Sequence, residues 1–359
     1  MRKKICLVSL GNLYLSPYIE KYLENIDCDY DLIYWNRHGL KEDNQNAKKI
    51  YSFDYELTED KGKIMKLIGY IKFKNFMTRI LNENQYSGII LLQTSVGILL
   101  LSILKRSYKK KYILDIRDYT MEKNPLFLKI IKWLVKNSAY SIISSDGFKN
   151  FLPEHEYILV HNDIALDTNK FIELKNEERS EKQINISCIG LIRFHDQNIK
   201  VIDKFKNDER FRLKFIGTGA LALKEYCYKV KALNVELVDR FPTEETLRYY
   251  LNTDLINNLY GNNSPLLDHA LSNKLYYAAK LKIPILVSPK THMASVVSKY
   301  GLGFVFDLDD YDSANDLYEF YESINRKDFE MNCEKFLTKV NAENELFKRT
   351  VSKFVEDLK

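Results

Sequence analysis

The stretch that decides the fold runs from Leu255 to Ser288 and reads LINNLYGNNSPLLDHALSNKLYYAAKLKIPILVS. Its apolar runs at Leu255–Leu259 and Ile283–Val287 predict two buried strands, separated by a polar loop and a helix over about Ser272–Lys280. Ser272 is a residue type that caps helix N-termini, and the apolar residues after it recur at helical spacing. The stretch therefore predicts a strand–helix–strand unit of a parallel sheet.

The first turn of that helix is a candidate anion site. Backbone N–H groups there lack partners within the helix, and the positive end of the helix dipole points the same way. Asn273 adds a side-chain donor and Lys274 adds a charge. These residues predict a phosphate or carboxylate ligand, while a solvated lysine at a helix start explains Lys274 equally well.

Short segments around this stretch follow a recurring pattern. They are Asn273-Lys274-Leu275, Ala278-Ala279, Ile283-Pro284-Ile285 and Tyr300-Gly301-Leu302-Gly303. This succession resembles the nucleotide-sugar site of GT-B glycosyltransferases, and most of all the family-four enzymes that build bacterial capsules and related surface glycans. The resemblance is best from about Ile186 to Asp310, and it is to a pattern rather than to one protein.

Composition indicates a soluble globular protein. The 359 residues exceed the usual size of a single core, so two domains are expected. Hydrophobic residues make up 45% and charged residues 29%, which excludes disordered and fibrous classes. Five scattered cysteines form no C-x-x-C pair, which indicates neither a zinc site nor a disulfide framework and fits a reducing cytoplasm. The longest apolar run, Val96–Leu104, is far below the roughly 20 residues that span a bilayer, and the start MRKKICLVSLGN reads as a strand rather than a signal peptide.

Positive charge is concentrated in the first part of the chain. Residues 1–150 hold 25 Lys and Arg against 16 Asp and Glu, whereas the remainder holds 29 against 33. A basic half suits an anionic membrane or substrate, and no nucleic-acid motif accompanies it. The stretches KLIGYIKFKNFMTRI (66–80) and PLFLKIIKWLVK (125–136) combine apolar residues with lysines as interfacial helices do. A core-packing helix with snorkelling lysines is the better interpretation for at least one of them.

Strand-like and helix-like segments alternate along both halves, as in parallel α/β sheets. Besides the two strands above, strands are predicted at Ile5–Ser9, Tyr30–Trp35, Gly88–Gln93, Tyr112–Ile116, Tyr140–Ser144, Tyr157–Val160, Ile184–Gly190, Leu213–Gly217, Val235–Val238 and Gly303–Phe306. Further helices are predicted at Pro17–Asn25, Lys63–Asn82, Val96–Lys105, Pro125–Lys136, Asp146–Phe151, Lys200–Phe205, Leu221–Ala232 and Thr243–Leu251, with His195 and Asp196 in the loop before Lys200. With the resemblance, this implies an α/β fold of GT-B type: two doubly wound, Rossmann-like domains facing across a cleft. We expect an acceptor-side domain at 1–170, a linker at Glu173–Gln183, a nucleotide-sugar domain at 184–328, and a helical tail at 329–359 that crosses back to the first domain.

Candidate donor-binding residues follow the first two strands of the second domain, because ligands of such sheets lie at the carboxyl ends of strands. Gly190 and Arg193 end the first of these strands. Arg193 is the first choice for the donor diphosphate, since a guanidinium forks onto phosphate oxygens and keeps its charge, and it would act with Lys274. Gly217 and Gly219 follow the next strand, where a wall of the phosphate site and a plain tight turn are equally good explanations.

The sharpest departure from the family concerns two glutamates that most members place eight residues apart, the second contacting ribose hydroxyls. These positions fall on His269 and Tyr277, neither of which is a carboxylate. Asp268 is a neighbouring substitute for the first. Further donor contacts are expected from Tyr260, Asn263, Ser264, Ser272, Asn273 and Leu275. The departure leaves either a variant donor site or no catalysis.

In the first domain, Gly11 and Asn12 close the first strand–helix turn, where GT-B enzymes keep a loop near donor and acceptor. Arg117 and Asp118 end another strand, at a place where many relatives hold a polar pair near the transferred sugar. The resemblance makes Asp118 a catalytic candidate, and a structural Arg117–Asp118 ion pair is the alternative of about equal weight.

The resemblance implies a retaining glycosyltransferase that moves a sugar from a nucleoside diphosphate sugar to a glycan or lipid-linked glycan in bacterial capsule or surface polysaccharide synthesis. It implies no metal and no cofactor, because cationic side chains and a helix N-terminus stabilise the departing diphosphate. We expect a cytoplasmic protein with peripheral membrane contact and no nucleic-acid partner. Two alternatives stay open: a nucleotide-sugar 2-epimerase, and a non-catalytic GT-B subunit.

Overall fold

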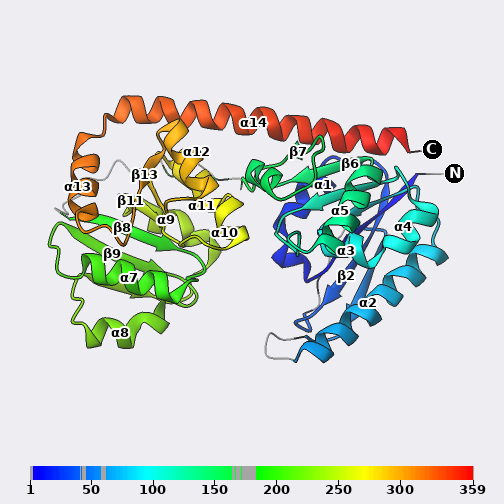
Figure 1. Ribbon diagram of the computed structural model, residues 1–359, viewed down its shortest axis with the longest axis horizontal. Coiled ribbons are helices and arrows are strands. Elements are labelled where there is room, and N and C mark those ends of the chain that lie inside the picture. The colour runs from blue at the N-terminus through cyan, green and yellow to red at the C-terminus, as the bar shows by residue number, and fades with distance from the viewer. Residues whose placement is uncertain are drawn as a thin grey trace. The chain divides into compact units, whose positions relative to one another are not determined.

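The computed structural model describes residues 3–40, 42, 46–57, 62–163, 166, 171 and 183–358. The chain forms two compact units (Figure 1). Unit 1 comprises Met1–His161 with Ala342–Lys359, and unit 2 comprises Asn162–Asn341. Each unit is built on its own parallel sheet with helices. The predicted linker lies outside the described residues except for Gln183.

Unit 1 holds a seven-stranded parallel sheet in the order β3-β2-β1-β4-β5-β6-β7. Its strands are β1 (Lys4–Ser9), β2 (Asp29–Asn36), β3 (Lys49–Asp54), β4 (Gly88–Leu91), β5 (Tyr112–Ile116), β6 (Tyr140–Ile143) and β7 (Ile158–Leu159). Ile5 of β1 pairs with Tyr30 on one side and with Gly88 on the other, so the strand order reverses between β1 and β4. Strand β3 was not predicted, because this edge strand is half-exposed along its length and contains no buried apolar run.

The helices of unit 1 connect these strands. They are α1 (Glu20–Leu23), α2 (Lys63–Glu83), α3 (Thr94–Leu99), α4 (Leu101–Ser107) and α5 (Pro125–Asn137), with 3₁₀ turns at Leu13–Leu15, Pro17–Ile19 and Asp146–Asn150. The single helix predicted over 96–105 is divided at Leu100, whose backbone leaves the helical region. Gly97 lets this segment approach closely, since a Cβ there would lie 3.1 Å from the Leu134 side chain.

Unit 2 holds a six-stranded parallel sheet in the order β10-β9-β8-β11-β12-β13, so the order reverses between β8 and β11. Its strands are β8 (Ile184–Ile189), β9 (Phe211–Ile216), β10 (Val235–Val238), β11 (Leu255–Asn258), β12 (Ile285–Val287) and β13 (Gly303–Val305). Its helices are α7 (His195–Phe205), α8 (Lys224–Lys229), α9 (Thr246–Leu251), α10 (Pro265–His269), α11 (Asn273–Leu281), α12 (His292–Tyr300) and α13 (Ser313–Ser323). Helices α10, α12 and α13 were not predicted. Helix α7 begins five residues before the predicted Lys200, so His195 and Asp196 lie on its first turn rather than in a loop.

The strand–helix–strand unit predicted from residues 255–288 is confirmed as β11, α11 and β12. The Ser272 hydroxyl caps α11 by accepting a hydrogen bond from the Lys274 N–H at 3.3 Å. Lys282, in the left-handed region at φ +54°, ends the helix. Leu275, Ala278 and Ala279 are fully buried in the core that covers the sheet.

The last helix, α14 (Arg326–Asp357), contributes to both cores. Its first half supplies apolar residues to the core of unit 2: Phe329, Cys333, Phe336 and Val340. Its second half, with the residue that follows it, supplies apolar residues to the core of unit 1: Phe347, Val351, Phe354, Val355 and Leu358. The tail was predicted at 329–359. Its apolar residues recur every three to four positions along the whole helix, and those before residue 341 belong to the core of unit 2, so only the later part packs on unit 1.

Candidate functional site

Two loops meet at the carboxyl edge of the unit 2 sheet, where the strand order reverses between β8 and β11. In open α/β sheets, ligands bind at the carboxyl ends of the strands, at the point where the strand order reverses. One loop, 190–194, follows β8, and the other, 259–264, follows β11. Their contact is aromatic, because the ring centroids of Phe194 and Tyr260 lie 4.8 Å apart.

Glycines allow the loops after β8 and β9 to pack backbone against backbone. Gly190, Gly217 and Gly219 have φ angles of +107°, +126° and +94°. A Cβ on Gly217 would lie 2.0 Å from the Gly190 carbonyl oxygen, and one on Gly219 would lie 2.8 Å from the Ile192 carbonyl oxygen. The Ile192 N–H donates to the Thr218 carbonyl at 2.9 Å. Glycine is thus required for the tight turn, while contact with a phosphate stays a prediction.

Lys274 is a buried cation on the first turn of α11. Its side chain is nearly inaccessible, and its ammonium donates to the Tyr260 hydroxyl at 2.8 Å. No carboxylate pairs with it among the residues that the structure describes. Burial opposes the charge, but Cys188 and Tyr260 favour it, and the pKa of Lys274 lies above its ordinary value. The surroundings of Lys274 therefore favour its protonated form.

Arg193 brings a second positive charge to this edge. It is close enough to Lys274 to oppose the ammonium's charge, and its exposed guanidinium has no hydrogen-bond or ion-pair partner within the described part of the chain. The Asn198 amide donates to the Arg193 carbonyl at 2.7 Å and holds the loop. Phe194 adopts φ +57°, a costly conformation for a non-glycine residue that is typical of ligand-binding loops. The structure thus places Arg193 and Lys274 at the same edge of the unit 2 sheet, near enough for their charges to repel, and a shared diphosphate ligand stays a prediction.

Tyr277 occupies the position of the second family glutamate, and it packs against another aromatic ring. Its ring stacks on Tyr250 with centroids 5.0 Å apart and an interplanar angle of 16°. Burial raises the pKa of Tyr277, whereas Lys274 lowers it, so the phenol lies in the electrostatic field of the buried cation. The structure therefore offers a neutral hydroxyl where the resemblance implies a carboxylate.

The remaining predicted donor contacts divide into loop-forming, packing and exposed residues. Asp268 accepts from the Asn263 N–H at 2.9 Å, so its carboxylate supports the loop. Leu275 is fully buried and packs in the core, so its predicted donor contact stays a prediction. Asn273 and Asn263 are exposed, and Ser264 precedes α10 at its N-cap position without capping it by its side chain. His269, on α10, has interactions within the protein.

The corresponding reversal in unit 1, between β1 and β4, is occupied by side chains that bind each other. Asn12 is fully buried, and its amide nitrogen donates to Asn36 Oδ1 at 2.9 Å and to Glu42 Oε2 at 2.7 Å. Its oxygen accepts from the N–H groups of Arg37 and His38. All hydrogen-bonding positions of the Asn12 amide are therefore used. Asn12 thus holds this loop, and its predicted acceptor contact stays a prediction. Gly11 beside it is half-buried, with open space around its Cβ position.

Arg117 forms an ion pair with Asp115, two residues before it. Arg117 Nε lies 3.0 Å from both carboxylate oxygens, and the guanidinium covers the Tyr18 ring at 3.8 Å. The Tyr22 hydroxyl donates to Asp115 at 2.8 Å. Burial raises the pKa of the Asp115 carboxyl and Arg117 opposes that rise. Asp118 is exposed and has an interaction of its own; it belongs to unit 1, whereas Arg193 and Lys274 belong to unit 2.

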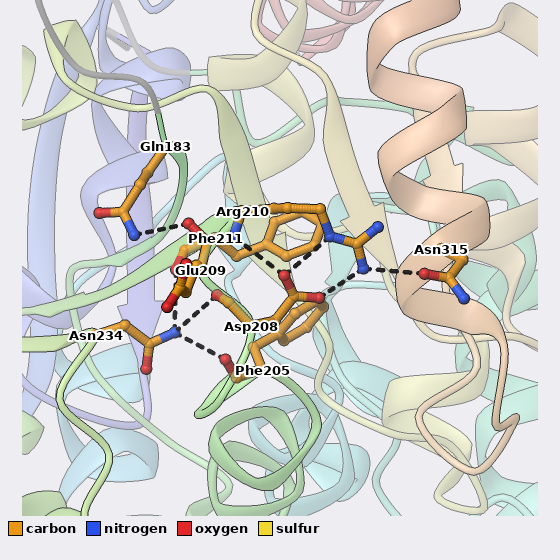
Figure 2. Close-up of polar contacts among 8 residues, drawn as sticks. All are labelled: Gln183, Phe205, Asp208, Glu209, Arg210, Phe211, Asn234 and Asn315. Atoms are coloured by element: carbon orange, nitrogen blue, oxygen red, sulfur yellow. Dashed lines mark hydrogen bonds and ion pairs between the residues drawn. The ribbon is translucent and has the colours of Figure 1, made fainter.

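The amino edge of the unit 2 sheet carries an open cavity of about 620 Å³ with a polar network beside it (Figure 2). Arg210 donates to both oxygens of Asp208, at 2.9 and 2.6 Å, and to Asn315 at 3.0 Å. The Asn234 amide donates to the carbonyls of Phe205 and Phe211. Arg210 holds the pKa of Asp208 below its ordinary value. Apart from Asn234 Oδ1, which has no hydrogen-bond partner among the described residues, these groups bind one another, so we assign this edge a structural role.

Sequence reasoning did not select Phe194, Tyr250 or Cys188. Phe194 reaches the site because its own backbone is left-handed. Tyr250 reaches it by stacking on Tyr277, which lies in a distant segment. Residue spacing in the sequence predicts neither feature. Cys188 is the second-last residue of β8, and its position beside the end of a predicted strand was the available signal.

Among the described residues no helix is long and apolar enough to cross a membrane. Within the same residues no group of three or more His, Cys, Asp and Glu side chains is arranged to hold a metal ion.

Comparison with protein-family models and with curated proteins finds no match. Solved structures do match. A glycosyltransferase from Rickettsia africae superposes with a TM-score of 0.68 at 11% identity, covering 99% of this chain and 100% of that one. Sucrose-phosphate synthase from Thermosynechococcus elongatus gives 0.68 at 11%, covering 99% and 95%. Anabaena HepE in complex with UDP gives 0.68 at 10%, covering 98% and 100%. The chain therefore has the GT-B glycosyltransferase fold.

Proposed function

We propose that this protein is a retaining, metal-independent glycosyltransferase of bacterial capsule or surface polysaccharide synthesis. It takes a sugar from a nucleoside diphosphate sugar to a glycan or lipid-linked glycan. One observation carries the proposal: Arg193 and Lys274 both lie at the strand-order reversal of unit 2, within electrostatic range of each other, and neither has a carboxylate partner among the described residues. Support also comes from the likeness to HepE, whose structure contains UDP.

In the proposed reaction the bond between the anomeric carbon and the β-phosphate oxygen breaks, and an acceptor hydroxyl oxygen bonds to that carbon. The departing diphosphate accepts hydrogen bonds from the Arg193 guanidinium and the Lys274 ammonium. These cations stabilise the negative charge that grows on the leaving group. The hydroxyl of Tyr260 positions the ammonium. The acceptor proton passes to a diphosphate oxygen on the same face of the sugar. Asp118 is the catalytic candidate from unit 1, by the resemblance to relatives that hold a polar pair near the transferred sugar.

A non-catalytic GT-B subunit is the second candidate. It is favoured by the replacement of both family glutamates, at His269 and Tyr277. Such a subunit would bind an acceptor or a partner and would not turn over a donor.

The test is release of nucleoside diphosphate from UDP-, GDP-, ADP- and dTDP-sugars, with and without a lipid-linked glycan fraction. We expect one donor to be consumed only when acceptor is present, with the anomeric configuration retained by NMR, and with activity unchanged by EDTA. Donor turnover without acceptor would indicate the 2-epimerase. Absence of turnover together with absence of nucleotide binding would support the non-catalytic subunit. Arg210→Met, far along the sheet at its other edge, is the control variant for Lys274→Met.

A further inference from the structure

Helix α2 carries two apolar faces, and only one of them is covered. The covered face includes Gly69, Phe73 and Met77. It packs on Trp35, whose ring centroid lies 5.2 Å from that of Phe73 and whose ring a Cβ on Gly69 would meet at 2.8 Å. This face accounts for the attachment of α2 to the unit 1 sheet.

The opposite face of the first two turns forms an exposed stripe, which we call the α2 stripe. It consists of Ile64 (75% exposed), Leu67 (61%), Ile68 (38%) and Ile71 (51%). These residues follow the spacing i, i+3, i+4, i+7 that places side chains on one helix face. A helix that is apolar on both faces is normally covered on both, so the stripe indicates an interaction surface.

The α2 stripe continues an apolar rim at the carboxyl edge of the unit 1 sheet. Helix α2 follows β3, so its first turns lie at that edge. The other exposed large apolar side chains between residues 3 and 163, apart from Met65 on α2 itself, also follow strand ends: Tyr14 and Leu15 after β1, Leu40 after β2, and Met121 and Leu126 after β5. The exposed apolar surface of this part of unit 1 is thus gathered on the edge that carries the loops.

The charges beside the stripe are positive. Helix α2 holds Lys63, Lys66, Lys72, Lys74 and Arg79 against the single acid Glu83. At about 100° per residue, Lys72 and Lys74 lie on the two sides of the stripe. An apolar stripe between lysines fits the surface of an anionic bilayer, with the apolar side chains at the acyl boundary and the lysines at the headgroups. A second copy of the chain fits less well, because its stripe would bring like charges together.

Helix α5, the other lysine-rich apolar stretch, has no such second face. Ile131, Leu134 and Val135 are buried, and Trp133 is half-buried with the Lys105 ammonium 5.3 Å from its ring centroid. Only Leu126, at its start, joins the rim. From the sequence, either stretch could be an interfacial helix or a core-packing helix. The exposed apolar face of α2, which α5 lacks, distinguishes the two.

We propose that the α2 stripe and its lysines dock unit 1 on an anionic lipid bilayer. The inference extends the proposed function, because a lipid-linked acceptor is presented at such a surface. Vesicle binding requires neither donor nor acceptor, so its failure would leave the transferase proposal standing.

The test is co-sedimentation of the full chain with vesicles of phosphatidylglycerol and phosphatidylcholine, compared with phosphatidylcholine alone. We expect binding to the anionic vesicles, weakened by salt. The triple variant Ile64→Gln/Leu67→Gln/Ile71→Gln should bind at least about tenfold more weakly with an unchanged melting temperature, since the replaced side chains are exposed. Lys72→Gln/Lys74→Gln should lose the preference for anionic lipid.

The matched control removes three even more exposed apolar side chains from unit 2: Tyr228→Gln/Leu233→Gln/Tyr311→Gln should bind as the unmodified protein does. The proposal is overturned if the unmodified protein ignores anionic vesicles or if the triple variant binds undiminished. It is equally overturned if the triple variant converts a dimer to a monomer or lowers the melting temperature, because the stripe would then be a protein interface.

Discussion

The two edges of the unit 2 sheet use the same kinds of charged residue in opposite ways. At the amino edge Asp208, Arg210 and Asn315 bind one another (Figure 2). At the carboxyl edge Lys274 is buried and Arg193 is exposed, and neither has a carboxylate partner among the described residues. This difference supports the proposal that the carboxyl edge binds an anion.

Unit 1 shows that topology alone does not create the site. Its strand order also reverses beside its first strand, yet Asn12 and the Asp115–Arg117 pair use their polar groups within the protein. Within the described part of unit 1, buried atoms without a hydrogen-bond partner also occur, at Arg37 Nε and Nη2 and at Thr94 Oγ1. The difference between the two reversals therefore lies in the buried ammonium of Lys274, which has no carboxylate partner among the described residues.

The largest expected effect concerns the glycine turns at the two reversals. Gly217→Ala should destabilise the protein by about 4 kcal/mol, because its Cβ would lie 2.0 Å from a carbonyl oxygen at φ +126°. Gly11→Ala, with open space around the Cβ position, should change stability by less than about 0.5 kcal/mol. Urea unfolding measures both, and equal effects would remove the distinction between the two turns.

The buried ion pair of unit 1 ranks second. Asp115→Ala should cost about 3 kcal/mol, because it leaves the Arg117 guanidinium buried without this partner. Thermal unfolding of the variant measures the loss. The double variant Asp115→Leu/Arg117→Met should recover much of it, and a double variant as unstable as the single one would contradict the explanation.

Loss of a cation should affect stability to different degrees at the two edges of unit 2. Arg210→Met should lower stability by about 1–2 kcal/mol, since it breaks three hydrogen bonds to charged or amide oxygens. Lys274→Met should lower it by less than about 1 kcal/mol, since it breaks one hydrogen bond, to the Tyr260 hydroxyl, and removes an ammonium that has no carboxylate partner among the described residues. Calorimetry compares the two, and a loss for Lys274→Met as large as that for Arg210→Met would contradict this difference.

The smallest effect is the pH dependence of the amino edge. The Arg210 hydrogen bonds hold the pKa of Asp208 below its ordinary value, so the unfolded chain binds this proton more readily. The contribution is present above the unfolded pKa near 4 and is lost as the pH falls through the lower folded value. Asp208→Asn should therefore cost about 1 kcal/mol at pH 7 and less as the pH falls below 4. Acid titration of the unfolding midpoint checks this, and a cost that is independent of pH would contradict it.

The sequence was sufficient for features that depend on local patterns. The buried runs and the cap at Ser272 predicted β11, α11 and β12, and strand ends in a parallel sheet predicted that Arg193 and Lys274 share an edge. The sequence was insufficient where contacts between distant segments determine the structure. Edge strand β3 lacks a buried run, and the four hydrogen bonds of Asn12 come from residues 36–42.

Phe194 shows the same limit inside the site. Its ring contacts Tyr260 from a residue whose backbone is left-handed. A left-handed backbone is uncommon for residues other than glycine, so the sequence does not predict it at a phenylalanine. The exchange of glutamate for Tyr277 was readable from the sequence, but its stacking on Tyr250 required coordinates.

The central claim is that the carboxyl edge of unit 2 binds a nucleoside diphosphate through Arg193 and Lys274. The most direct test is a thermal-shift comparison of the unmodified protein, Lys274→Met, Arg193→Ala and Arg210→Met with UDP, GDP, CDP, dTDP and ADP. A ligand at 100 times its dissociation constant stabilises the folded state by about 2.7 kcal/mol. The account predicts that one nucleotide raises the melting temperature of the unmodified protein and Arg210→Met but of neither Lys274→Met nor Arg193→Ala. Equal shifts in all four proteins, or no shift in any, would contradict it.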